Sequence, residues 1–198
     1  MNYIARMSIK FSHIASTYNE YLDSLYAYAL HLGFDEESAM DAIHDVFYKL
    51  CIQHASLNEI QNLKFYLFRS LRNRLIDLKR MQREFVDPPI SLHILPRSQE
   101  GTDAGHSLPF HLNVTVEDEL IQKEDAEEIR QKVENVLNRL THRQREVIYL
   151  RYIQECSYEE IAKIMQISVA ASRNLVSKSM MKMRAASLTL TLFLWVVT

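Results

Sequence analysis

Four polar side chains that can hydrogen-bond to the edges of DNA bases lie close together near the end of the chain: Arg173, Asn174, Ser177 and Lys178. Arginine pairs best with guanine and asparagine with adenine, each through two hydrogen bonds. Three further basic residues in the same region, Arg143, Arg145 and Lys163, suit phosphate oxygens. Phosphate contacts position a protein on DNA without reading its sequence. The residues predict non-covalent binding of double-stranded DNA.

Two helices joined by a tight turn must position these side chains. Ser157 and Glu160 have the spacing of a capping box, which begins a helix, and Ser168 can cap a second helix. The pattern is typical of a helix-turn-helix, whose second helix enters the major groove. A left-handed residue is expected in the turn, where Gln166 stands, at a cost of about 1 kcal/mol. The alternative is an ordinary helical hairpin with a solvated charged face. Small residues that allow the two helices to cross closely are Ala162, Ser172 and Ser179.

A second stretch, residues 63–83, combines a stripe of leucines at helical spacing with many basic residues. Phe65, Tyr66 and Phe68 stand among the basic residues near its start, and Asn62 can cap the helix. Aromatic side chains interleaved with Arg and Lys suit single-stranded bases and their phosphates. The alternative is a solvated amphipathic helix whose aromatic side chains lie in the core.

The charge distribution agrees with a nucleic-acid partner, although the net charge is −2. Residues 139–184 contain nine basic and four acidic residues, a net charge of +5, whereas acidic residues dominate 99–138. The local field sets the affinity for phosphates, so this segregation outweighs the total.

Composition favours a helical globular protein with no covalent chemistry. The 198 residues are 47% hydrophobic and 24% charged, with three glycines and four prolines. Cys51 and Cys156 have no metal or redox spacing. No Ser/His/Asp spacing, glycine-rich phosphate loop or metal cluster is found, so we expect neither an enzyme nor a cofactor or metal. Because no secretory signal opens the chain, we expect a cytoplasmic protein.

The fold class is all-α, with two small helical domains joined by a flexible linker. All the prolines lie between Val86 and Phe110, which marks residues 86–114 as the linker. The first domain, 8–85, is predicted to contain helices over residues 11–32 and 36–54, a loop over 52–61, and the helix over 63–83. The second domain, 115–186, is predicted to contain four helices. The first covers residues 115–139, the second begins at a capping box formed by Thr141 and Gln144, and the last two form the helix-turn-helix. Residues 187–198 form an apolar, β-prone tail that is too short to span a bilayer.

Three motifs in this order resemble the extracytoplasmic-function (ECF) sigma factors of bacterial RNA polymerase, small members of the sigma-70 family. DAIHDVFYKL (Asp41–Leu50) is similar to the D-x-x-Q-E-V-F segment that docks on the clamp coiled coil, with His44 and Asp45 in place of Gln and Glu. NLKFYLFRSLRNRLIDLKR (Asn62–Arg80) is similar to the helix that contacts the minus-ten element, in a form most like that of Bacteroidetes members. LTHRQREVIYLRYIQECSYEEIAKIMQIS (Leu140–Ser168) is similar to the minus-thirty-five-binding domain.

The resemblance implies binding to core polymerase, recognition of both promoter elements and assistance in promoter melting. It implies polymerase contacts at Asp41, His44, Asp45, Phe47 and Tyr48. It implies minus-ten contacts at Asn62, Lys64, Tyr66, Arg69, Arg72, Asn73, Asp77 and Arg80. It implies that Arg143, Arg145, Lys163, Arg173, Asn174, Ser177 and Lys178 contact the minus-thirty-five element. The expected partners are core RNA polymerase, promoter DNA and an anti-sigma factor, and the free chain is expected to be a monomer.

Two other classes remain as alternatives. A stand-alone helix-turn-helix regulator would be a dimer on a palindromic site, and it leaves the helix at 62–80 unexplained. A helical interaction protein that sequesters a partner would show no salt-dependent affinity for DNA.

Overall fold

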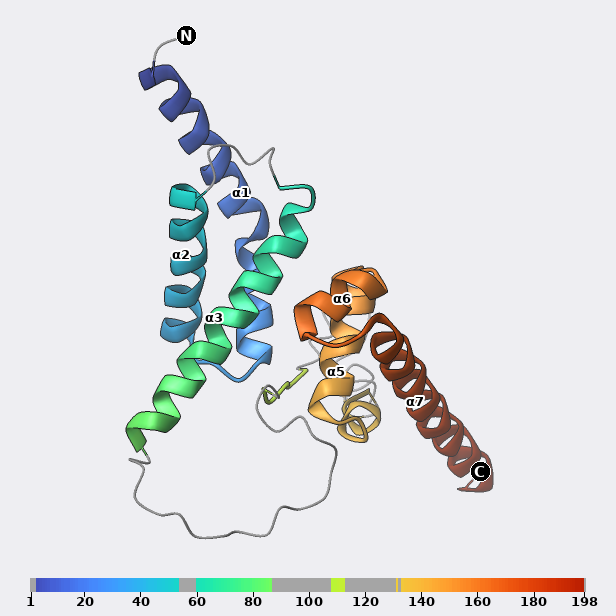
Figure 1. Ribbon diagram of the computed structural model, residues 1–198. Helices are drawn as coiled ribbons and strands as arrows, with labels where there is room; N and C mark the ends of the chain where they lie inside the picture. Colours follow the sequence, from blue (N-terminus) through green and yellow to red (C-terminus); the bar gives the residue numbers. More distant parts are fainter. Residues whose placement is uncertain (1–2, 54–59, 87–107, 113–130, 132, 198) are drawn as a thin grey trace, which may run out of the picture. The chain divides into compact units, whose positions relative to one another are not determined.

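The computed structural model describes residues 3–53, 60–86, 108–112, 131 and 133–197, and every regular element within them is a helix (Figure 1). The chain divides into two compact units, Met1–Leu108 and Pro109–Thr198. The predicted all-α fold with two helical regions is confirmed.

Three helices that pack pairwise on one another form the first unit. They are α1 (Tyr3–His31), α2 (Glu36–Gln53) and α3 (Leu63–Val86). The first begins earlier than the predicted Phe11. Full burial of each leucine or isoleucine contributes about 1.5–3 kcal/mol. Fully buried members of this core include Leu25, Leu32, Ile43, Leu50, Leu67, Leu71 and Leu75.

Turn and capping residues fix the ends of these helices, including the predicted cap at Asn62. Gly33, with φ of 81°, follows the end of α1. Asp35 caps α2 because its carboxylate accepts hydrogen bonds from the Ser38 N–H at 2.9 Å and the Ser38 hydroxyl at 2.8 Å. These bonds hold the pKa of Asp35 below its ordinary value of 3.8. Asn62 caps α3 by accepting from the Phe65 N–H at 3.0 Å. Most of the predicted loop at 52–61 lies outside the described residues.

The second unit contains a short helix at 133–138, followed by α5, η2, α6 and α7. Both predicted capping boxes are present, at Thr141 with Gln144 and at Ser157 with Glu160. Most of the helix predicted at 115–139 lies outside the described residues. The bounds are His142–Ile148 for α5, Tyr149–Ile153 for η2, Tyr158–Met165 for α6 and Val169–Val197 for α7.

The element η2 is a π-helix that the sequence did not predict. Its wider turn is closed by the Gln154 N–H, which donates to the Tyr149 carbonyl oxygen at 3.0 Å. A π-turn carries one residue more than an α-turn and so rotates the residues that follow it. Within this element the Tyr152 side chain is 54% exposed.

Residues 108–112 differ from the flexible linker that was predicted there. The Phe110 side chain is fully buried, and its ring centroid lies 5.5 Å from that of Tyr149. The Phe110 N–H donates to Nδ1 of His142 at 3.0 Å. Burial raises the pKa of Tyr149, although Gln154 Nε2 donates to its hydroxyl oxygen. Phe110 therefore belongs to the core of the second unit, while residues 87–107 lie outside the described part.

The C-terminal residues also differ from the prediction, because the backbone of α7 continues as helix to Val197. No glycine or proline occurs after Ser168, and leucine is a strong helix former. The alternation of Leu and Thr that suggested a β-prone tail is thus carried on a helical backbone. Among the described residues, no helix is long and apolar enough to cross a membrane.

Candidate nucleic-acid interface

The outer face of α2 presents three of the residues predicted to contact polymerase. Asp41 and His44 are exposed, and the Tyr48 side chain is 66% exposed. The Tyr18 hydroxyl of α1 lies 3.1 Å from Nε2 of His44. The structure corrects the polymerase contact predicted at Phe47. Its side chain is only 5% exposed, and its ring meets that of Tyr18 edge-on, with the ring centroids 5.0 Å apart. Phe47 is therefore a core residue rather than part of an open docking face.

Most of the predicted minus-ten residues lie on accessible parts of α3 and its cap. Lys64, Tyr66 and Asn73 are half-buried, and the exposed members are Asn62, Arg69, Asp77 and Arg80. The structure corrects the minus-ten contact predicted at Arg72, because the Arg72 side chain is only 2% exposed. The sequence grouped Arg72 with the surface cations, but it lies on the leucine side of the helix, within the core of the first unit. Arg72 is thus removed from the candidate contacts.

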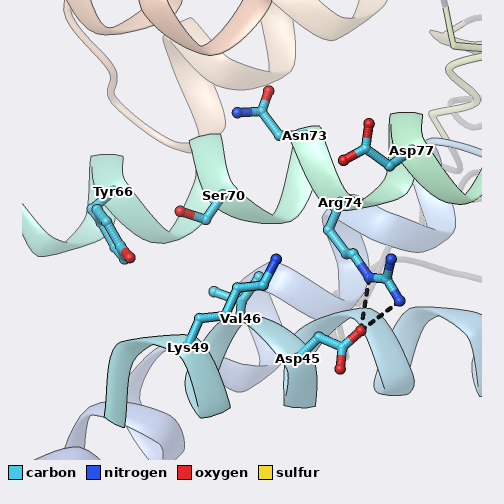
Figure 2. A pocket seen from close by; sticks show the side chains of 8 residues that line it. All are labelled: Asp45, Val46, Lys49, Tyr66, Ser70, Asn73, Arg74 and Asp77. Atoms are coloured by element: carbon cyan, nitrogen blue, oxygen red, sulfur yellow. Dashed lines mark hydrogen bonds and ion pairs between the residues drawn. The ribbon is translucent and has the colours of Figure 1, made fainter. Parts of the chain in front are cut away.

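A pocket of about 240 Å³ lies between α2 and α3 (Figure 2). Residues Asp45, Val46 and Lys49 line it from α2, and Tyr66, Ser70, Asn73, Arg74 and Asp77 line it from α3. Figure 2 shows Arg74 reaching from α3 to Asp45 of α2, and Nε of Arg74 donates to the Asp45 Oδ2 at 2.7 Å. The pair connects a predicted polymerase contact with the helix predicted to bind the minus-ten strand. Nothing in the sequence pattern indicated this contact across 29 residues.

The turn between α6 and α7 has the geometry predicted for a helix-turn-helix. Gln166 is left-handed, with φ of 56° and ψ of 49°. Ser168 caps α7 by accepting from the Ala171 N–H at 3.1 Å. The Ser172 hydroxyl donates to the Tyr158 carbonyl oxygen of α6 at 3.0 Å, so a small polar side chain joins the two helices where they cross. Ala162, Ser172 and Ser179 are all buried, as their small size predicted.

The outward face of α7 carries the four predicted base-reading side chains in exposed positions: Arg173, Asn174, Ser177 and Lys178. The Arg173 side chain is 61% exposed, and its Nη2 lies 3.3 Å from Oε1 of Glu159 on α6. Its guanidinium also lies 5.6 Å from the ring centroid of Tyr158. An exposed pair of this kind costs little to separate, so Arg173 remains accessible to a base edge.

The three predicted phosphate contacts have different environments. Lys163 is exposed and Arg143 is half-buried. The structure corrects the phosphate contact predicted at Arg145, because its guanidinium donates hydrogen bonds to two backbone carbonyl oxygens. Its Nε donates to the Leu137 carbonyl oxygen at 3.0 Å and its Nη1 to the Phe110 carbonyl oxygen at 3.3 Å. Arg145 thus secures the second unit and is removed from the candidate DNA contacts.

No group of three or more His, Cys, Asp or Glu side chains that could hold a metal ion occurs in the part of the chain that the structure describes. The two sites are instead polar and aromatic surfaces on helices. They suit reversible binding to nucleic acid and protein.

Comparison with known proteins identifies both units. Residues 17–85 match the family described as Sigma-70 region 2, and residues 130–183 match the family described as Sigma-70, region 4. The chain therefore belongs to the sigma-70 family. The matched residues fall in the first and second units respectively. Region 2 covers α2 and nearly all of α3, and region 4 covers α5, η2, α6 and the first half of α7.

Within this family the chain is similar to sigma factors of the ECF type. It is 22% identical over 181 residues to the ECF RNA polymerase sigma factor SigM of Bacillus subtilis (strain 168), with 87% of this chain and 93% of the relative covered. Its fold resembles that of the sigma factor RpoE from Bartonella quintana, solved in complex with the anti-sigma factor NepR. That match has a TM-score of 0.54 and 23% identity, and it covers 87% of this chain and 94% of the other.

Proposed function

We propose that this chain binds bacterial core RNA polymerase, recognises the minus-thirty-five and minus-ten elements of promoters, and assists their melting. The observation that supports this most strongly is the presence of Sigma-70 regions 2 and 4, in that order, in one chain. Sigma factors are initiation factors that act by binding and perform no covalent chemistry. The free energy for opening the promoter therefore comes from binding to DNA.

In the proposed mechanism the first unit docks on polymerase through the exposed face of α2, with Asp41, His44 and Tyr48. The accessible side of α3 then holds the non-template strand. Flipping a base out of the stack costs a few kcal/mol, and stacking on an aromatic such as Tyr66 returns roughly 1–3 kcal/mol per base. Polar and basic residues that would contact the strand are Asn62, Lys64, Arg69, Asn73, Asp77 and Arg80.

The second unit reads the minus-thirty-five element in the major groove. Arg173 and Asn174 suit guanine and adenine, and Ser177 and Lys178 extend the same face by one helical turn. Arg143 and Lys163 contact phosphates and fix the helix in the groove. The stand-alone regulator is disfavoured because it gives region 2 no role.

The partners of this proposal are core polymerase, promoter DNA and an anti-sigma factor, and the site of action is the cytoplasm. The anti-sigma partner is proposed because the similar RpoE was solved bound to one. Its contact surface is proposed to include the helical residues 187–197. Deleting residues 187–198 tests this assignment, and unchanged inhibition by the partner would count against it.

The test of the main proposal is co-elution with core RNA polymerase in size-exclusion chromatography. Stable co-elution, followed by promoter-specific initiation with the reconstituted holoenzyme, is expected of a sigma factor. Asp41→Ala provides a matched variant that should weaken co-elution. Failure to join core polymerase of the native host, together with tight duplex binding by the chain alone, would favour the stand-alone regulator.

A further inference from the structure

Asp45 of α2 and Arg74 of α3 form an ion pair between the two helices. Arg74 Nε donates to Oδ2 of Asp45 at 2.7 Å, and Nη2 lies 2.7 Å from the same oxygen (Figure 2). Both distances are those of charge-assisted hydrogen bonds. The side chains are 30% exposed for Arg74 and 44% for Asp45, so the pair is partly shielded from water. Such a pair is stronger than one between fully exposed side chains.

Each member of the pair has another oppositely charged residue within reach on its own helix. Lys49 follows Asp45 by four residues on α2, and Asp77 follows Arg74 by three residues on α3. Opposite charges at these spacings pair on helix surfaces. All four residues line the same pocket. The bond across the two helices therefore competes directly with pairing along each helix.

We propose that Asp45 is a positioning residue that acts through Arg74, rather than a direct contact to polymerase. This inference rests on the proposed sigma-factor function. Asp45 holds the Arg74 guanidinium over α2, away from Asp77, and so fixes α3 against α2. Without that carboxylate, Arg74 turns to Asp77 on its own helix. The guanidinium then neutralises a carboxylate assigned to the minus-ten surface.

A change at Asp45 should therefore affect promoter melting without affecting docking on core polymerase. Asp41, His44 and Tyr48 remain exposed on α2 whether or not the pair forms, so the affinity for core polymerase should not depend on Asp45. The surface of α3 does depend on it, because Arg74 changes partners. If Asp45 instead contacted polymerase directly, removing its carboxylate would lower the affinity for core polymerase, and removing the Arg74 guanidinium would not.

The experiment compares Asp45→Asn, Arg74→Gln, the double substitution and the charge exchange Asp45→Arg with Arg74→Asp. The affinity for core polymerase is measured by fluorescence titration, and the rate of promoter opening by permanganate reactivity at saturating holoenzyme. We expect each single variant to slow opening about three- to tenfold, as loss of a partly buried ion pair implies. The core affinity should stay within about twofold of the wild type, by the same reasoning. Glu37→Gln removes another acidic charge from α2 and serves as the matched control.

The double substitution and the exchange decide whether the two residues act as one unit. The double should be no slower than either single variant, and the exchanged pair should recover most of the rate, because coupled residues are not additive. Additive losses, single variants with unchanged opening, or an Asp45→Asn variant that loses core affinity while Arg74→Gln does not would each overturn the inference.

Failure of the proposed function gives a different result. A wild-type chain that does not join core polymerase would count against the sigma-factor proposal itself. Whether Asp45 acts through Arg74 would then be read from urea unfolding of the same four variants. Additive changes in the free energy of unfolding would contradict the pairing.

Discussion

Arg145 donates a hydrogen bond from Nη1 to the carbonyl oxygen of Phe110 at 3.3 Å. A second bond, from Nε to the carbonyl oxygen of Leu137, joins the same guanidinium to the end of the helix at 133–138. One side chain of α5 therefore fastens two segments that precede it. Replacing Arg145 is therefore expected to lower the stability of the second unit, and not only its affinity for DNA.

Arg145→Ala should lower the stability of the second unit, because two backbone carbonyls lose a charged donor. Hydrogen bonds to charged groups are worth about 1.5–3 kcal/mol, so a loss of about 2 kcal/mol is expected in urea unfolding. Lys163→Ala is the control. It is exposed and should change stability by less than about 0.5 kcal/mol, while weakening DNA binding and reducing its salt dependence. Equal stability of the two variants would return Arg145 to the phosphate contacts.

Phe110→Ala should destabilise the second unit more strongly, because it empties a fully buried site against Tyr149. Truncation of a buried phenylalanine costs about 3–5 kcal/mol. Hydrogen exchange of the α5 amides measures the effect on this unit alone. Leu112→Ala, at a half-buried position of the same segment, should cost less. Unchanged exchange in the Phe110 variant would mean that the segment contributes nothing to the fold.

Arg173→Ala should lower promoter-specific initiation and leave co-elution with core polymerase unchanged. A bidentate contact to a base discriminates by about 1–3 kcal/mol, which is roughly a five- to 150-fold effect. Arg173→Lys keeps the charge but loses the two-donor geometry, so it should fall between the wild type and the alanine variant. Equal loss of polymerase binding and initiation would contradict the assignment to the minus-thirty-five element.

Gln166→Gly should keep or raise stability, by up to about 1 kcal/mol, because glycine adopts the left-handed conformation without a Cβ clash. Gln166→Val should lower stability by more than about 1 kcal/mol, since a β-branched residue is poorly tolerated at positive φ. Thermal unfolding of the two variants gives the comparison. A valine variant as stable as the glycine variant would show that the turn relaxes to another conformation.

The cap at Asp35 should make stability depend on acidic pH. Its pKa is lowered in the folded chain, chiefly by the Ser38 N–H, so the unfolded chain binds the proton more readily. The stabilisation is present above the ordinary pKa of 3.8 and is lost as pH falls through the depressed folded value. Asp35→Asn keeps a capping side chain but cannot titrate. The stability of the wild type relative to this variant should therefore decline below pH 3.8, as measured by urea unfolding. A constant difference would exclude the carboxylate as the cause.

Local patterns account for what the sequence predicted well. Capping residues such as Asn62, Ser157 and Ser168 act on neighbours three positions away, so the sequence alone contains both partners. The face of α7 follows from helical spacing, and it placed Arg173 and Lys178 outward correctly. The left-handed Gln166 was expected because the turn between α6 and α7 leaves room for little else.

Contacts between distant residues account for what it missed. Arg72 falls beside an apolar stripe, and only the packing of α1 to α3 decides that its side chain is inside. Arg145 shares its basic character with Arg143, and the carbonyl oxygens that bind it come from segments that sequence spacing does not place. The Asp45–Arg74 pair is hidden for the same reason, since its members stand 29 residues apart.

The π-helical turn at Tyr149–Ile153 has a consequence for how this domain tolerates changes in length. A π-turn is an α-helix into which one residue has been inserted without loss of the surrounding fold. Deleting a single residue there would restore ordinary α-helical winding, whereas the same deletion in α6 or α7 would rotate every later side chain by about 100°, one step of a 3.6-residue turn. A single-residue deletion in this segment should therefore disturb the exposed face of α7, the proposed DNA-reading surface, less than a deletion within α6 or α7.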